Sequence, residues 1–140
     1  MNPGKGGRPI QILMVEDNLD DIDLIMEALK DGKVNNILSP VKDGEEAIAY
    51  LRCAGGFGQA PRPDLILLDL HMPGMTGIDV LKELKSHHYA GGVIALSGSQ
   101  DRALLQEMFR LGAVDVIGKP VDLQRLGLVV AVNATLAATA

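Results

Sequence analysis

The sequence predicts an α/β domain with a five-stranded parallel sheet and helices on both faces. Short apolar runs alternate five times with segments whose apolar residues recur at helical spacing. The run at 65–68 is wholly apolar, as expected of a strand that is buried on both faces. Right-handed crossovers between parallel strands favour a doubly wound sheet. Because Pro40 favours an edge position for the second strand, the simplest order is 2-1-3-4-5, the flavodoxin-like arrangement.

The first strand and helix follow from local signals. A strand is expected at 10–15, where the residues are mostly apolar. Asn18 is a suitable cap for the next helix, and Asp20 and Asp21 lie in its first turn, where negative charge favours the helix dipole. Gly32 is expected to end this helix.

The middle of the chain supplies the edge strand and the central strand. A strand at 36–41 is followed by Asp-Gly-Glu-Glu from Asp43, which is similar to a capping box. A loop rich in Gly and Pro is expected at 54–62, before the strand at 65–69. Thr76 is expected to cap the helix after that strand.

The last third of the chain completes the alternation. A fourth strand is expected at 93–96, and Asp101 is a suitable cap for a helix that Gly112 closes. A short strand at 115–118 leads into the last helix, which Asp122 opens and which runs to about residue 136.

Length and composition predict a single domain at 10–140 after a flexible lead-in at 1–9. The net charge of −5 and an aromatic content of 3% disfavour nucleic-acid binding. No apolar run is long enough to cross a bilayer, and the lead-in lacks the apolar core of a signal peptide. Cys53 is the single cysteine, which excludes an internal disulfide and favours a reducing, cytoplasmic location.

Acidic residues follow two strands that the predicted order makes neighbours. Glu16 and Asp17 follow the first strand, and Asp69 ends the third. In open α/β sheets ligands bind at this carboxyl edge. Three unpartnered carboxylates would repel one another, and Mg²⁺, which prefers carboxylate oxygens and water, would relieve that repulsion. The alternative is that Glu16 and Asp17 bind no ligand and only stabilise the N-terminus of the following helix.

Two further polar residues are expected at the same edge. Ser97 ends the fourth strand and offers a hydroxyl donor, and Lys119 ends the fifth and adds a cation. With a bound metal such a site suits in-line phosphoryl transfer to Asp69. Pro120 is a candidate for a cis peptide bond, which would fix where Lys119 points. The backbone carbonyl of His71 is a better metal-ligand candidate than its ring.

These residues, in this order, resemble the receiver domain of two-component response regulators from about residue 10 to the last helix. The resemblance implies that Asp69, within Asp-Leu-His-Met-Pro-Gly, is the phosphoacceptor. It implies that Glu16 and Asp17 bind Mg²⁺ together with Asp69 and the main-chain carbonyl of His71. The expected phosphoryl donor is a histidine kinase.

The resemblance also assigns a conformational switch. Ser97 is the switch hydroxyl, Gly98 is its small neighbour, and Lys119 contacts the phosphoryl group. One position departs from the family: Val116 stands three residues before Lys119, where receivers usually have Tyr or Phe. The aromatic–hydroxyl mechanism therefore cannot operate here in its usual form.

The local sequences at 16–21, 43–47 and 60–64 resemble those of stand-alone response regulators associated with phytochrome histidine kinases. Members of that group often form dimers, and we expect no output domain. The last helix carries apolar residues on more than one side, which is typical of a homodimer or partner interface: Leu126, Val129, Val130, Val132 and Leu136.

Three other functions compete with a phosphorylated receiver. A phosphorylation-independent pseudo-receiver fits Val116, although the complete set of acids argues against it. A haloacid-dehalogenase-type phosphatase needs a second acid two residues after the nucleophile, where this chain has His71. A flavin carrier of the same topology needs a phosphate-binding loop after the first strand, and no Ser/Thr/Gly-rich loop stands there.

Overall fold

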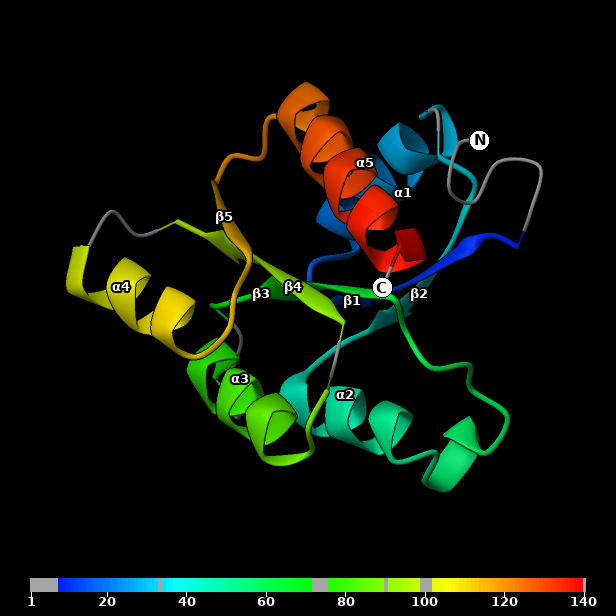
Figure 1. The fold of residues 1–140 in the computed structure, drawn as a ribbon, viewed down its shortest axis with the longest axis vertical. Helices are drawn as coiled ribbons and strands as arrows, with labels where there is room; N and C mark the ends of the chain where they lie inside the picture. The colour runs from blue at the N-terminus through cyan, green and yellow to red at the C-terminus, as the bar shows by residue number, and fades with distance from the viewer. Residues whose placement is uncertain (1–7, 33, 72–75, 90, 99–101, 140) are drawn as a thin grey trace.

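The chain forms a three-layer α/β sandwich around one parallel sheet (Figure 1). The computed structural model describes residues 8–32, 34–71, 76–89, 91–98 and 102–139, with side chains described through residue 134. The sheet has five strands in the order β2-β1-β3-β4-β5, and every neighbouring pair is parallel. The fold class and the strand order that the sequence predicts are therefore confirmed.

Strands and helices alternate along the chain as expected. The strands are β1 (Ile10–Val15), β2 (Asn36–Val41), β3 (Leu65–Asp69), β4 (Gly92–Ser97) and β5 (Asp115–Gly118). The helices are α1 (Leu19–Lys30), α2 (Gly44–Leu51), α3 (Gly77–Ser86), α4 (Arg102–Arg110) and α5 (Leu123–Thr139), with a 3₁₀ turn, η1 (Gly55–Phe57). The last helix is three residues longer than predicted, because nothing in its Ala-rich end breaks it.

Each face of the sheet has its own hydrophobic core. Helices α1 and α5 cover one face, and α2, α3 and α4 cover the other (Figure 1). Successive residues of β3 alternate between the two cores: Ile66 and Leu68 pack toward α2–α4, and Leu65 and Leu67 toward α1 and α5. All five residues of β3 are buried, which explains why its sequence lacks polar alternation.

Side-chain caps fix where several helices begin. Asn18 and Thr76 accept from the backbone N–H three residues on, and Thr76 forms a reciprocal capping box with Asp79. The capping box expected at Asp43 is only half formed, because the Glu46 side chain accepts from the backbone of residue 42 instead of the cap. The expected cap Asp101 lies outside the described residues.

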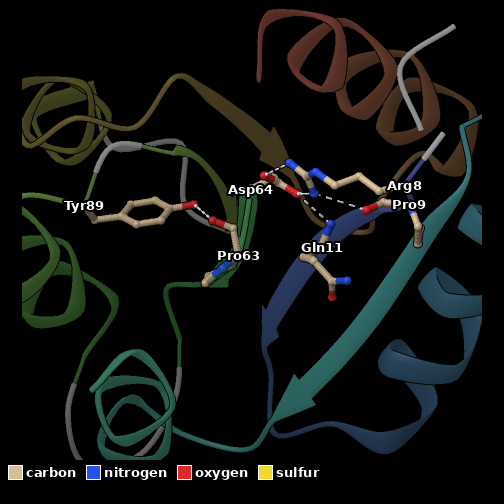
Figure 2. A network of polar contacts seen from close by, with 6 residues as sticks. All are labelled: Arg8, Pro9, Gln11, Pro63, Asp64 and Tyr89. Atoms are coloured by element: carbon tan, nitrogen blue, oxygen red, sulfur yellow. Dashed lines mark hydrogen bonds and ion pairs between the residues drawn. The ribbon is translucent and has the colours of Figure 1, made fainter. Parts of the chain in front are cut away.

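The amino ends of β1 and β3 are tied together by a polar network (Figure 2). Arg8 donates two hydrogen bonds to Asp64, each 2.9 Å long, and the backbone N–H of Gln11 donates to the same carboxylate at 2.9 Å. Arg8 keeps the pKa of Asp64 below its usual value. Arg8 belongs to the lead-in that the sequence predicts as flexible, so the structure fixes this residue where the sequence analysis does not.

Helix α5 distributes its apolar residues differently from the sequence prediction. Leu126 and Val130 are buried against the sheet and Val129 is half-buried, so these residues do not form an exposed face. Val132 is 60% exposed, as predicted, and Leu128, one turn earlier, is 70% exposed. The exposed apolar strip is therefore narrower than expected, because Leu126, Val129 and Val130 pack toward the core. The side chain of Leu136, also in the predicted set, lies outside the described residues. Within the described ranges, no helix is long and apolar enough to span a membrane.

Candidate functional site

Three carboxylates meet at the carboxyl edge of the sheet. Val15 pairs with Leu68 in the β1–β3 register, so Glu16 and Asp69 follow on adjacent strands. Carboxylate oxygens of Glu16, Asp17 and Asp69 all lie within 4.8 Å of one another. Glu16 and Asp69 are each 1% exposed, whereas Asp17 is exposed to solvent. The structure thus brings together the acids that the sequence places at neighbouring strand ends.

Lys119 supplies a positive charge directly above the buried acids. Its backbone N–H donates to the carbonyl of Ser97 at 2.8 Å, which places the end of β5 beside the end of β4. Its Nζ lies 3.0 Å from Oδ2 of Asp69 and 3.4 Å from Oε1 of Glu16. The peptide bond between Lys119 and Pro120 is cis.

Both oxygens of Asp69 are held by different groups. Oδ1 accepts from the backbone N–H of His71 at 3.0 Å, and Oδ2 faces the Lys119 ammonium at 3.0 Å. Glu16 is less well satisfied, because its buried Oε2 has no hydrogen-bond donor among the described residues. An unpartnered carboxylate oxygen at this depth is costly unless a proton or a cation satisfies it.

The electrostatics of the pair follow from burial and proximity. Burial raises the pKa of Glu16 to about 9, and the Asp69 carboxyl adds to this rise. Burial also raises the pKa of Asp69, but hydrogen bonds from Glu16 and His71 and the charge of Lys119 outweigh it, so this pKa is lowered. Burial opposes the raised pKa of Lys119, and its contacts with Asp69 and Glu16 outweigh that effect. The two shifts have opposite directions, so in the metal-free protein they favour the proton on Glu16 and the negative charge on Asp69.

The remaining predicted residues surround this pair. Ser97 is buried at the end of β4, and Gly98 follows it at the surface. A Cβ on Gly98 would come within 4.0 Å of the His71 ring, so the two loops approach closely here. The His71 side chain is exposed, and its backbone N–H holds Asp69.

Val116 lies on β5, which β4 separates from β3 and its Asp69. It pairs with Ala95 on β4 and packs, half-buried, against the core under α2–α4. A valine at this position has neither the length nor the hydroxyl of the aromatic residue that receivers usually carry there.

Asp21 is an acid of this region that the sequence analysis assigns only to the helix dipole. It lines a cavity of about 340 Å³ together with Glu16 and Lys119. Its carboxyl is close enough to add to the raised pKa of Glu16, after burial and Asp69. The sequence signal that could have placed Asp21 near Glu16 is its position three residues after the cap Asn18. Side chains in the first turn of a helix point back toward its N-terminus.

The sequence profile described as response regulator receiver domain matches residues 12–131. The chain belongs to the response regulator receiver family. Receiver domains are signalling modules of two-component systems, and the five-stranded 2-1-3-4-5 fold agrees with this assignment.

Similar receivers include proteins associated with phytochromes. Response regulator Rcp1 of Synechocystis sp. is 42% identical over 79 residues, which are 56% of this chain and 54% of Rcp1. The solved structure of RcpA, described as a phosphorylated cyanobacterial phytochrome response regulator, is 40% identical with a TM-score of 0.77, covering 88% of this chain and 89% of that chain.

Two more solved structures are similar to this receiver. The Mn(2+)-bound form of Rcp1 is 33% identical with a TM-score of 0.77, covering 88% of this chain and 90% of that chain. The bacteriophytochrome response regulator RtBRR is 32% identical with a TM-score of 0.76, covering 90% of this chain and 77% of that chain. The receiver spans about half or less of the length of the curated relatives it matches, from 54% of Rcp1 to 15% of the Escherichia coli regulatory protein AtoC.

Proposed function

We propose that this receiver is a single-domain response regulator that accepts a phosphoryl group on Asp69 in a Mg²⁺-dependent reaction. The observation that carries the proposal is the setting of Asp69: it is buried and oriented through both of its oxygens. A carboxylate nucleophile needs its negative charge and a fixed direction of attack. The lowered pKa of Asp69 favours its negative charge, and the contacts with His71 and Lys119 fix its direction.

The residues around Asp69 fit a divalent cation. Glu16 and Asp17 bring oxygens within 4.8 Å of Asp69 and of each other, and Oε2 of Glu16 is buried without a donor. Hard cations such as Mg²⁺ prefer such oxygen donors and retain several waters. We include the main-chain carbonyl of His71 among the ligands. The Mn(2+)-bound form of the similar protein Rcp1 supports the proposal that this receiver binds a divalent ion.

The chemistry assigned to the chain is in-line transfer from a phosphohistidine. An oxygen of Asp69 attacks phosphorus, the new O–P bond forms as the P–N bond breaks, and the electron pair stays on the imidazole of the donor. Lys119 neutralises charge on the equatorial oxygens, and Ser97 offers its hydroxyl to the transferred group. When bound, Mg²⁺ would neutralise further negative charge on the phosphoryl oxygens.

The proposed donor is a histidine kinase of the phytochrome class. This part of the proposal rests on similarity, since RcpA and RtBRR are both described as phytochrome response regulators. Cys53 is unpaired and exposed, which suits a reducing compartment such as the cytoplasm.

We propose that the output is a protein–protein contact at the apolar strip of α5, with a homodimer as the first candidate. Leu128 and Val132 are four positions apart, so they lie on the same side of the helix. Their side chains are 70% and 60% exposed, respectively. Two large apolar side chains exposed one turn apart are typical of an interface.

The decisive experiment measures intact-protein mass after incubation with acetyl phosphate. We expect one phosphoryl adduct on the wild type with Mg²⁺, no adduct when a chelator removes the metal, and no adduct on Asp69→Asn. Asp79→Asn is the matched control, because Asp79 is an exposed carboxylate in the capping box of α3 and is not part of the cluster of Glu16, Asp17 and Asp69. A wild-type protein without an adduct under any condition would favour the pseudo-receiver, and full modification of Asp69→Asn would refute the phosphoacceptor assignment.

A further inference from the structure

Asp21 lies in the first turn of α1 and lines a cavity beside Glu16. Its backbone N–H donates to the side chain of Asn18 at 3.1 Å, which fixes it as the third residue of the helix. Side chains at this position tilt toward the helix N-terminus, and the N-terminus of α1 follows directly after Glu16 and Asp17. The half-buried Asp21 accordingly lines the same cavity as Glu16 and Lys119.

The neighbouring aspartates of α1 do not share this position. Asp20 and Asp23 are exposed, and neither lines the cavity. Asp20 and Asp21 both lie in the first turn of the helix and interact with its dipole, so that interaction does not distinguish Asp21 from Asp20. What distinguishes Asp21 is that it lines the cavity beside Glu16.

At this point the buried carboxyl of Glu16 has one oxygen without a partner among the described residues. Oε2 of Glu16 has no donor in the described part of the chain, and the Glu16 side chain is 1% exposed. Lys119 is the cation of the cavity, and its Nζ is already engaged by Asp69 and by Oε1 of Glu16. Asp21 adds a further acidic group in the cavity next to Glu16, one of the three convergent carboxylates.

We propose that Asp21 is a positioning residue of the cation site, whose charge strengthens Mg²⁺ binding although it is not itself a ligand. This inference rests on the proposed Mg²⁺ site. The negative charge of Asp21 attracts the bound Mg²⁺ through space, without direct coordination. Asp21 and Glu16 line the same cavity. The contribution of Asp21 to the raised pKa of Glu16 agrees with this proximity.

The test measures the dissociation constant of Mg²⁺ by isothermal titration calorimetry, with no phosphoryl donor present. One missing negative charge near a dication should weaken binding by about three- to tenfold at low ionic strength. We expect this loss for Asp21→Asn and for Asp21→Ser, and a change of less than about twofold for Asp20→Asn. Asp20→Asn is the matched control, because it removes the same charge from the same helix turn.

Two further measurements distinguish an effect of the Asp21 charge from an effect on the local structure. Asp21→Glu keeps the charge and should retain affinity close to that of the wild type. The difference between wild type and Asp21→Asn should shrink as ionic strength rises, because salt screens interactions at this range. A merely structural role would produce a loss that Asp21→Glu does not rescue and that salt does not change.

The outcomes distinguish this inference from the proposal on which it rests. Wild-type protein that binds no Mg²⁺ would overturn both the cation site and the role of Asp21. Wild-type binding with equal affinity in Asp21→Asn and Asp20→Asn would overturn the role of Asp21 alone. A salt-sensitive loss in Asp21→Asn with rescue in Asp21→Glu would establish it.

Discussion

Glu16 gives the metal-free protein an unusual dependence of stability on pH. Its pKa is raised to about 9 in the folded chain, from an ordinary value of 4.5, first by burial and then by Asp69. Between these two values the folded state binds a proton that the unfolded state has lost. The stability that Glu16 contributes is therefore present below pH 4.5 and is lost as pH rises toward 9.

The size of the effect follows from proton linkage. One extra bound proton lowers the free energy of unfolding by at most about 1.4 kcal/mol for each pH unit, or about 2.7 kcal/mol from pH 6 to pH 8. For a chain of this length that corresponds to a fall in melting temperature of about 5–10 °C. The lowered pKa of Asp69 and the raised pKa of Lys119 have little effect here, because their unfolded values of 3.8 and 10.5 lie outside this interval.

The assay is thermal unfolding at pH 6, 7 and 8 in the presence of a chelator. The wild-type melting temperature should fall across this series, and Glu16→Gln should remove most of the slope because its amide does not titrate. Glu45→Gln, at an exposed position in the first turn of α2, should keep the slope of the wild type. With Mg²⁺ the stabilisation should grow from pH 6 to pH 8, because binding displaces the proton from Glu16.

A flat or rising wild-type melting temperature would refute this reasoning. So would a slope that survives in Glu16→Gln, since the proton would then belong to another group. Mg²⁺ stabilisation that is equal at pH 6 and pH 8 would show that Glu16 is already ionised in the metal-free protein.

Gly77→Ala should destabilise the fold by about 1–3 kcal/mol in urea denaturation, because an added Cβ would lie 2.7 Å from the backbone Cα of Leu70. Gly56→Ala is the control, since no atom lies within 4 Å of its Cβ position, and equal effects of the two variants would contradict the packing argument. For the proposed α5 interface, sedimentation equilibrium should show concentration-dependent association that Leu128→Glu and Val132→Glu both weaken. A wild-type monomer at all concentrations would count against that interface.

The acid-lined edge of the sheet could be located from the sequence because it depends on topology. The wholly apolar run before Asp69 predicts a central strand, and Pro40 predicts an edge strand. Together they make β1 and β3 neighbours, so the acids after each strand must approach one another. This step needs only strand order, which hydrophobic patterning and the handedness of crossovers largely determine.

The α5 helix illustrates why side-chain exposure is harder to predict. Leu126 and Val130 are as apolar as Leu128 and Val132, and the sequence alone suggests one broad face. The rotation of the helix about its axis decides which pair meets β3, β4 and α1, and that rotation is set by packing against them. Leu126 and Val130 are buried, and Leu128 and Val132 are exposed.

The sequence by itself determined the α/β class, the strand order and the convergence of Glu16, Asp17 and Asp69, because these depend on periodicity along the chain. Only the tertiary structure decided which groups come together: Lys119 pairs with both buried acids, and Asp21 lines the same cavity as Glu16. Burial and distances of a few ångströms set the charge state of a carboxyl, and residues far apart in sequence supply both. For this reason the raised pKa of Glu16 is a property of the folded chain.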